Sequence, residues 1–353
     1  MKAAFLQIFG VTALWRRLHK YKLSVVTLHG VMSDESSSSW KPLRWQMEPE
    51  VLRRYLSVLA AKYEFVSADE AIAMVTGEKP MRKHCMLLTI DDGYRNALTH
   101  ALPILKEFGV RPLIFVVTGK LDCPSYYWFD RLDAALQEYA ESNDQVYFED
   151  YVIRLDRNSH SQMSAACKKI ISESRRRYPD DDTRAQRIET FIQTLCESSS
   201  SAVKDQSITD PWFRPMSRAD VMEAIGSGAT IGSHTVSHVR LAGRSESNQL
   251  TELSLSREQL EDLTGADCDY FCFPEGSVDE LSSALAKSAG YKAAFVSENG
   301  LVDVHSDRFH IRRFHLPREA SNSALLAKVS GLTLFLAGVK RRILGTRENR
   351  VPT

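Results

Sequence analysis

Two adjacent carboxylates follow an apolar run in the segment LLTIDDGYRNA, residues 87–97. Asp91 and Asp92 end a predicted strand, and Gly93 tolerates backbone conformations that other residues resist. Successive strand residues point to opposite faces, so the chain must turn here for both carboxylates to reach one site. Asp and Gly are also common in turns, so the pair is weak evidence by itself. A role in chemistry requires partners elsewhere in the chain.

A second pattern supplies such partners in IGSHTVSH, residues 231–238. His234 and His238 lie four residues apart at the end of another apolar run. Two neutral imidazoles and one carboxylate can bind one divalent ion and leave positions open for water and substrate. The other carboxylate can then act as general base. Ordinary core or surface histidines are the alternative.

Short apolar runs rich in β-branched residues must position these side chains. Helical periodicity occupies most of the stretches between them, so the sequence predicts an α/β fold with a parallel sheet or barrel. Such folds carry their chemistry at the carboxyl ends of the strands. The predicted strands are 23–31, 84–93, 111–119, 229–234, 270–276, 293–297 and 310–316.

The alternation breaks between residues 121 and 215, where the chain is helical, highly charged and without convincing strands. We interpret this segment as a helical insertion between the two parts of a barrel. Trp128 and Asp130 lie near its start and form either a sugar-stacking lip or an anchor to the barrel. The predicted parts are an N-terminal amphipathic helix (1–22), first barrel part (23–120), insertion (121–215), second barrel part (216–320) and C-terminal apolar, basic helix and tail (321–353).

Composition restricts the classes of partner. The chain has 353 residues, 43% of them apolar, which is enough for a substantial core. Its 45 basic and 45 acidic residues cancel, so no global field favours nucleic acid. Six cysteines without a CxxC pair favour reduced thiols in a cytosolic setting.

Both ends of the sequence are apolar and basic. At the N-terminus most basic residues follow the apolar stretch, the reverse of a secretory signal. The C-terminal stretch 324–345 is interrupted by Lys328 and is too short to span a bilayer. It either packs on the domain or lies on a membrane surface. We therefore expect a cytoplasmic protein with possible peripheral contact at the inner face of the plasma membrane.

Taken in order, the motifs resemble the polysaccharide deacetylases of the NodB homology type. TIDDG matches the first family motif, T-F-D-D-G, with Ile90 for Phe, and HTVSH matches the second, H-[ST]-x-x-[HST]. FCFPEG is an altered form of the third, R-P-P-Y-G or A-Y-P-Y-G. VVTLHGV and FHIRRFHLP are similar to the first strand and to a late strand of the family. The resemblance covers roughly residues 23–120 and 215–318.

This resemblance implies a distorted (β/α) barrel that removes an acyl group from an N-acylated sugar with the help of a metal ion. Asp91 would be the catalytic base. Asp92, His234 and His238 would bind one divalent ion, most often zinc, with cobalt, nickel or manganese as alternatives. The backbone N–H of Glu275, beside Pro274 in the third motif, would stabilise the oxyanion.

Two residues depart from the family pattern. Cys272 stands where many members have an Arg that orients the base, and Glu275 stands where they have Tyr. Arg313 on the late strand is a candidate to supply the missing cation. A strand-end Arg with no part in catalysis is the alternative.

Other positions carry weaker predictions. His29 and His315 are candidates for the general acid, and His29 is preferred because its position faces the metal in related enzymes. Tyr94 and Arg95 follow the first motif, and they either line the sugar groove or only cap and pack the following helix.

The expected function is deacetylation of an N-acetylhexosamine in a bacterial surface glycan or its lipid-linked precursor. A deformylase, or another hydrolase of small C–N bonds, is the near alternative because the scaffold does not fix the acyl group. A glycan-binding protein without catalysis and an interaction scaffold built on the insertion are the alternatives from other classes.

Overall fold

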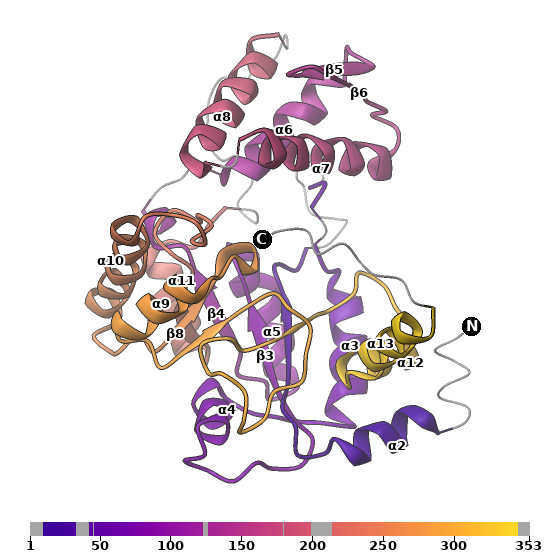
Figure 1. Ribbon diagram of the computed structural model, residues 1–353, viewed down its shortest axis with the longest axis vertical. Coiled ribbons are helices and arrows are strands. Elements are labelled where there is room, and N and C mark those ends of the chain that lie inside the picture. Colours follow the sequence, from indigo (N-terminus) through magenta and orange to yellow (C-terminus); the bar gives the residue numbers. More distant parts are fainter. Residues whose placement is uncertain are drawn as a thin grey trace.

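A single parallel sheet forms the centre of the molecule in the computed structural model, and helices pack around it (Figure 1). The structure describes residues 10–32, 42–44, 46–122, 126–178, 180–198 and 214–344. The strands in sheet order are β10 (Phe314–His315), β1 (Ser24–Leu28), β3 (Cys85–Ile90), β4 (Leu113–Val116), β7 (Thr230–Ser233), β8 (Tyr270–Cys272) and β9 (Ala293–Phe295), with β2 (Glu64–Phe65) paired to β3.

The sheet curls round on itself. A parallel bridge between Phe295 and Ile311 joins the end of β9 to the segment before β10, so the two outer strands approach each other. This arrangement confirms the predicted distorted (β/α) barrel. Because all pairs in the sheet are parallel, the carboxyl ends of β1, β3 and β7 meet at one edge.

The strands are buried on both faces, which explains why they read as continuous apolar runs. Val25 and Leu87 pack in one core cluster, whereas their neighbours Val26 and Leu88 pack in another. The surrounding helices are α3 (Pro49–Ala60), α4 (Ala68–Val75), α5 (Leu102–Glu107), α9 (Arg218–Gly226), α10 (Glu246–Thr264) and α11 (Glu280–Ser288), with short turns η1 (Ala97–Ala101), η2 (Thr118–Lys120) and η3 (Pro274–Gly276).

The predicted insertion forms a lobe above the sheet, at the top of Figure 1. It has its own core, in which Leu136, Phe148 and Ile170 are buried. The expectation that it lacks strands is wrong, because β5 and β6 form an antiparallel hairpin. Only every second residue of β5 is buried. Over a strand of four residues, this alternation is too brief to be distinguished from the helical pattern around it. Its elements are α6 (Trp128–Tyr139), β5 (Gln145–Phe148), β6 (Tyr151–Arg154), α7 (His160–Arg177) and α8 (Asp181–Ser198).

The first and last described helices lie together. Trp15 of α2 (Val11–Leu18) donates from Nε1 to the carbonyl of Ser330 at 2.9 Å, between α12 (Asn322–Val329) and α13 (Leu332–Leu344). Among the described helices, none alone has the length and apolar character to cross a bilayer. The pair α12–α13 meets that test together, but the chain bends by 74° between them.

Candidate active site

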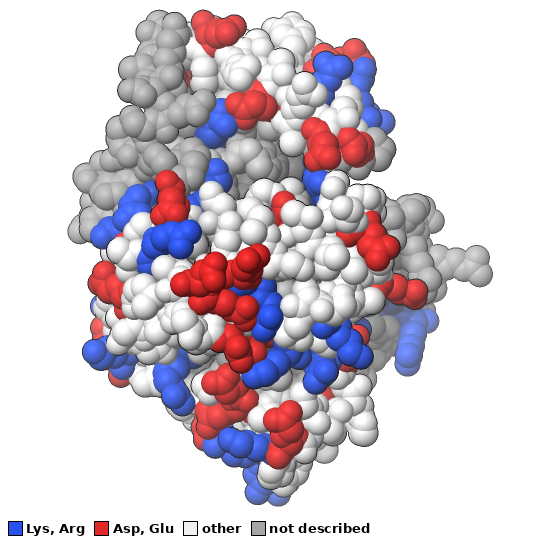
Figure 2. Space-filling view, turned by 90° about the vertical axis from the view of Figure 1, so that its left-hand side faces the viewer, with Lys and Arg blue, Asp and Glu red and all other residues white. Residues whose placement is uncertain are grey.

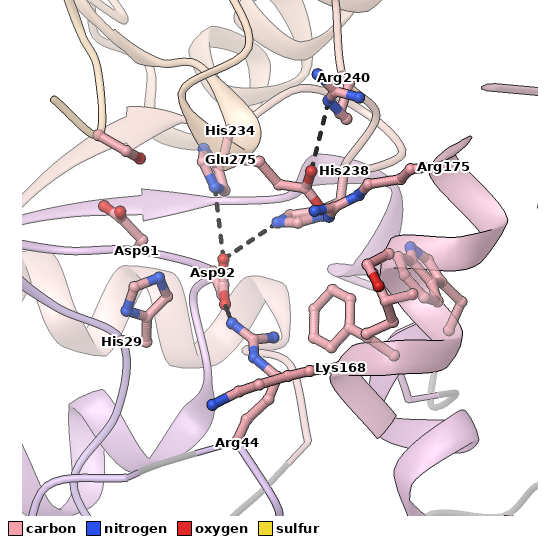
Figure 3. A pocket seen from close by; sticks show the side chains of 15 residues that line it. His29, Arg44, Asp91, Asp92, Lys168, Arg175, His234, His238, Arg240 and Glu275 are labelled. Atoms are coloured by element: carbon pink, nitrogen blue, oxygen red, sulfur yellow. Dashed lines mark hydrogen bonds and ion pairs between the residues drawn. The ribbon is translucent and has the colours of Figure 1, made fainter. Parts of the chain in front are cut away.

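The two carboxylates of the first motif reach one cavity because the chain turns between them. Asp91 follows β3 directly, and Asp92 adopts a left-handed conformation with φ 70°. Asp is among the few residues other than glycine that tolerate this region. Both residues line the same cavity, as Figure 3 shows. The turn that the sequence required is therefore made at Asp92.

Gly93 is needed for two reasons. Its φ is 63°, and a Cβ built on it would lie 3.0 Å from the Cα of Val116 in the adjacent strand. A side chain here would strain the backbone and push β4 away from the strand end that carries Asp91 and Asp92.

The two histidines of the second motif converge on Asp92. Nε2 of His234 lies 3.4 Å from Oδ1 of Asp92, and Nε2 of His238 lies 3.2 Å from the same atom. Nδ1 of His234 lies 2.7 Å from the carbonyl oxygen of Cys272, an acceptor that fixes a proton on Nδ1 and directs Nε2 toward Asp92. Ligand atoms of the three residues all lie within 4.8 Å of one another, and all three are buried. The donor set fits one divalent ion.

Arg44 holds the other side of Asp92. Its Nη2 donates to Oδ2 of Asp92 at 3.0 Å, and its guanidinium lies 4.1 Å from the centre of the Phe129 ring. Burial would raise the pKa of Asp92, but the Arg44 charge and the hydrogen bonds with His234 and His238 hold it well below its usual range. Asp92 is therefore ionised, with Oδ1 directed to the histidines and Oδ2 to Arg44.

Arg313 holds Asp91 with both ends of its guanidinium. Nη1 donates to Oδ1 at 2.6 Å and Nη2 to Oδ2 at 2.8 Å, and both residues are buried. Burial would raise the pKa of Asp91, but the charge and hydrogen bonds of Arg313 lower it to about 2. The cation that the sequence led us to expect beside Asp91 is thus present at residue 313.

The remaining donors of Arg313 are also used. Nε donates to the carbonyl of Val296 at 3.0 Å, and Nη1 donates to Oγ1 of Thr89 at 3.0 Å. Nη2 lies 3.1 Å from Sγ of Cys272, the residue that replaces the usual family Arg. These contacts fix the plane of the guanidinium and, through it, the orientation of Asp91.

A cavity of about 520 Å³ opens above the two carboxylates, within the range of roughly 300–1,000 Å³ typical of small-molecule sites. Both parts of the barrel and the insertion contribute to its wall. Its lining residues are His29, Arg44, Asp91, Asp92, Trp128, Phe129, Lys168, Ile171, Ser172, Arg175, His234, His238, Arg240, Glu275 and Ser297.

The structure separates the two histidine candidates for the general acid. His29 lines the cavity, whereas His315 lies beside it with the ring centroids 5.8 Å apart and is not part of the cavity wall. Burial lowers the pKa of His29, although the charges of Asp92 and Asp91 oppose the shift. Burial and the neighbouring His29 lower the pKa of His315 to about 4. The geometry favours His29.

Tyr94 does not line the cavity, which corrects the expectation of a place in the sugar groove and agrees with the alternative of packing. It is fully buried, and its hydroxyl donates to Oδ2 of Asp130 at 2.7 Å. Tyr94 is therefore a support beneath the site, and Asp130 anchors the insertion to the barrel. Trp128, in contrast, reaches the cavity wall. Arg95 binds Asp220 at 3.2 Å and lies outside the cavity wall.

The third motif contributes Glu275 to the cavity wall, whereas Pro274 is buried behind it and does not contact the cavity. Glu275 has a left-handed backbone with φ 57°. Its carboxylate binds Arg175 of α7 at 2.6 Å and approaches Arg240 at 3.5 Å, as Figure 3 shows. The Glu that replaces the family Tyr thus joins the barrel to the insertion.

Several lining residues were not predicted from the sequence. Arg44 lies in a segment without clear periodicity, and Lys168 and Arg175 lie in a charged helix that resembles a solvated face. The only signal was the charge itself, which occurs equally in surface helices. Phe129 was within the noted aromatic stretch, and its ring centroid lies 5.2 Å from that of His238.

Comparison with known proteins agrees with this geometry. A family model described as polysaccharide deacetylase matches residues 63–148 and 194–294, more than half of the chain. The chain belongs to the polysaccharide deacetylase family. The family match includes the first and second motifs and the third, and it omits residues 149–193 of the insertion.

Individual relatives of this deacetylase chain are distant. The Bacillus subtilis protein YxkH is 30% identical over 107 residues, which is 30% of this chain and 36% of YxkH, about a third of its length. The structure of the Streptococcus pyogenes deacetylase PplD in complex with acetate has a TM-score of 0.56 at 16% identity, covering 88% of this chain and 99% of PplD. IcaB from Ammonifex degensii has a TM-score of 0.54 at 16% identity, covering 88% and 97%. These structures share the fold of the deacetylase.

Proposed function

We propose that this polysaccharide deacetylase is a metal-dependent hydrolase that removes the N-acetyl group from an N-acetylhexosamine. The substrate would belong to a bacterial surface glycan or to its lipid-linked precursor. One observation carries the proposal: Asp92, His234 and His238 converge within 4.8 Å while Asp91, held by Arg313, faces the same cavity. PplD was solved with acetate, the product that this reaction releases.

Asp92, His234 and His238 would hold the ion, which we expect to be zinc in view of the two imidazoles and one carboxylate. When bound, a divalent ion would lower the pKa of a water and polarise the acyl carbonyl. Cobalt, nickel or manganese also suit this donor set, because imidazole binds all of them.

The chain's own groups would perform the proton transfers. Asp91 is ionised and would accept a proton from the water that attacks the acyl carbon. The backbone N–H of Glu275 would donate to the oxyanion that forms there. His29 would donate a proton to the amine nitrogen as the C–N bond breaks, which yields acetate and a free amino sugar.

Acetate and formate release from N-acetylated and N-formylated hexosamines, measured beside the metal content of the purified protein, tests this proposal. We expect acetate release that disappears with chelation and returns with zinc. Asp91→Asn should lower turnover by about 10²–10⁴-fold and retain the metal. A metal-loaded protein that releases neither acid would contradict the proposal and leave a glycan-binding role.

We also propose a cytoplasmic location with peripheral membrane contact. In support of the membrane contact, α13 exposes Leu334 and Phe335 and carries the exposed, basic Lys340 further along the same helix, and α2 exposes Leu14 and Leu18 nearby. Apolar and basic side chains together suit an anionic membrane surface. Sedimentation with phosphatidylglycerol vesicles, compared for the wild type and Phe335→Ser, tests it. Equal sedimentation of the two proteins would reject a contact through α13.

A further inference from the structure

Helix α7 of the insertion presents a regular face to the cavity. Lys168, Ile171, Ser172 and Arg175 are spaced i, i+3, i+4 and i+7, and all four line the cavity wall. The adjacent face of α7 is buried in the core of the insertion, which fixes the rotation of the helix. The cavity face is therefore held in place by packing. It also lies within residues 149–193, outside the family match.

Positive charge exceeds negative charge on this part of the wall. Asp91 and Asp92 have their own cations in Arg313 and Arg44. The other charged lining residues are Lys168, Arg175, Arg240 and Glu275, which are three cations and one carboxylate.

The one carboxylate cannot neutralise the three cations. Glu275 binds Arg175 and Arg240 together, at 2.6 and 3.5 Å. Lys168 extends from α7 into the cavity in Figure 3, and no carboxylate of the described residues lies within ion-pair distance of its ammonium.

The surplus of positive charge is confined to this part of the cavity wall. The whole chain has 45 basic and 45 acidic residues, and both signs are interspersed over the face in Figure 2. A neutral sugar offers hydroxyl groups and apolar ring faces, which do not require unmatched ammonium and guanidinium groups. An oxyanion is the ligand that such groups suit, because Arg and Lys bind phosphate and carboxylate through charge-assisted hydrogen bonds.

We propose that α7 forms a subsite for an anionic group, a phosphate or a carboxylate, carried by the substrate beside the N-acylated sugar. Lys168 supplies the unpaired cation, and Arg175 and Arg240 supply guanidinium groups that Glu275 holds in position. The inference rests on the proposed function for the identity of the sugar. The phosphate of a lipid-linked precursor and the uronate of a polymer both provide the required charge.

Three matched probes test the subsite with the full-length protein: di-N-acetylchitobiose, its 1-phosphate, and N-acetylglucosamine linked to glucuronic acid. We expect KM for one or both anionic probes to be about tenfold lower than for the neutral one. Lys168→Met should remove this preference. Lys169→Met is the control, because Lys169 packs over Tyr151 and does not line the cavity.

Ionic strength provides a second readout. Raising salt from about 0.01 M to about 1 M shortens the Debye length from about 30 to about 3 Å, so the anionic preference should fall while the neutral probe serves as internal reference. Preference for the 1-phosphate would indicate a precursor, and preference for the uronate a polymer.

Calorimetric binding of the same probes separates this inference from the proposed function. Tighter binding of an anionic probe that Lys168→Met abolishes supports the subsite, even if no probe releases acetate and the proposed function fails. Equal affinity for neutral and anionic probes, or a preference that survives Lys168→Met and Arg175→Gln, would overturn it.

Discussion

At the scale of single residues, positions 272 and 313 share one space beside Asp91. Sγ of Cys272 lies 3.1 Å from Nη2 of Arg313, and both side chains are buried. An Arg at position 272 would need the volume that the Arg313 guanidinium already occupies. The small Cys and the buried Arg313 therefore form a compatible pair, which explains how Asp91 keeps a cation although the third motif lacks one.

Removing that cation should move the pH dependence of the reaction. Asp91 has a pKa of about 2 because of Arg313, so it is ionised throughout the ordinary pH range. In Arg313→Met the carboxylate remains buried without its partner, and its pKa should rise by about 1–3 units. We expect the acid limb of the kcat/KM profile to move up in pH by the same amount.

Loss of one partner from a buried pair also destabilises the fold by about 3–5 kcal/mol, so Arg313→Lys, which keeps the charge, is the folded comparison. Arg312→Met is the control, because Arg312 is exposed and contacts Glu298 at 3.5 Å. An acid limb that stays in place in Arg313→Met, with unchanged turnover, would contradict the positioning role of Arg313.

Replacing Arg44 should lower the affinity for the metal ion and leave the proposed base, Asp91, unchanged. It fixes Oδ2 of Asp92, and removing such a partner of a ligand typically lowers metal affinity by about 10–100-fold. We expect Arg44→Met to show this loss in equilibrium dialysis with zinc. Arg53→Met on the exposed side of α3 should retain wild-type affinity. Equal zinc affinity in both variants would show that Asp92 needs no support from Arg44.

His29 should impose a basic limb on kcat. Its pKa is lowered by burial, and a general acid acts only while protonated, so its contribution is lost as pH rises through that lowered pKa. We expect kcat to decline with rising pH already below about pH 6.5, the usual pKa of histidine, with the decline absent in His29→Gln. His315→Gln should keep the decline. A wild-type kcat that is constant up to pH 8 would exclude His29 as the acid.

At the scale of elements, α6 connects the insertion to the site through buried carboxyl groups. Oδ2 of Asp133 accepts from the backbone N–H of Leu43 at 2.5 Å, next to Arg44. Burial raises the pKa of Asp133 to about 7. The folded protein therefore holds a proton on Asp133 at a pH where an unfolded chain has lost it.

This carboxyl group makes stability depend on pH in an unusual direction for Asp. Because the pKa of Asp133 is raised in the folded protein, its contribution to the free energy of unfolding is complete below about pH 4 and is lost as pH rises through about 7. We expect Asp133→Asn, which is neutral at every pH, to gain up to about 3 kcal/mol over the wild type between pH 4.5 and 7.5. Denaturant unfolding at both pH values measures the change.

Asp144→Asn is the control for this measurement, because Asp144 is exposed in the same lobe. Its stability should follow that of the wild type at both pH values. If Asp133→Asn did the same, Asp133 would have the ordinary pKa of an exposed carboxyl group.

The sequence predicts elements well where their pattern is strong. All seven predicted strands contain a strand of the sheet, because residues buried on both faces give continuous apolar runs. The hairpin β5–β6 was missed because each of its strands has only four residues and half of these residues are exposed to solvent. Helix α7 was predicted as a helix, but its cavity face carries the same residue types as a solvated face.

The residues of the candidate site likewise include some that the sequence predicts and some that it does not. Asp91, Asp92, His234 and His238 were predictable because each follows a strand within a recognisable motif. Arg44 and Lys168 were not, because their place beside the site depends on the docking of the insertion. Arg313 was predictable from the absence of a family Arg at Cys272. Tyr94 was misplaced because sequence does not tell which side of the first turn faces the cavity.

At the scale of the whole molecule, a bound ion should stabilise the fold. Asp92 on one barrel part and the two histidines on the other would be joined by it, and a ligand at about 100 times its Kd stabilises by about 2.7 kcal/mol. We expect chelation to lower Tm by several degrees and zinc to restore it. His238→Ala should not respond to either treatment. An unchanged Tm in the wild type would argue against a metal at these residues.

The order in which a ribosome makes the chain has a consequence for Asp91. Every proposed ion ligand has been synthesised once residue 238 emerges, but Arg313 follows 75 positions later, and β10 can dock only after it. Until then Asp91 has no guanidinium partner, so a nascent polypeptide can complete the proposed centre only after residue 313 has been added.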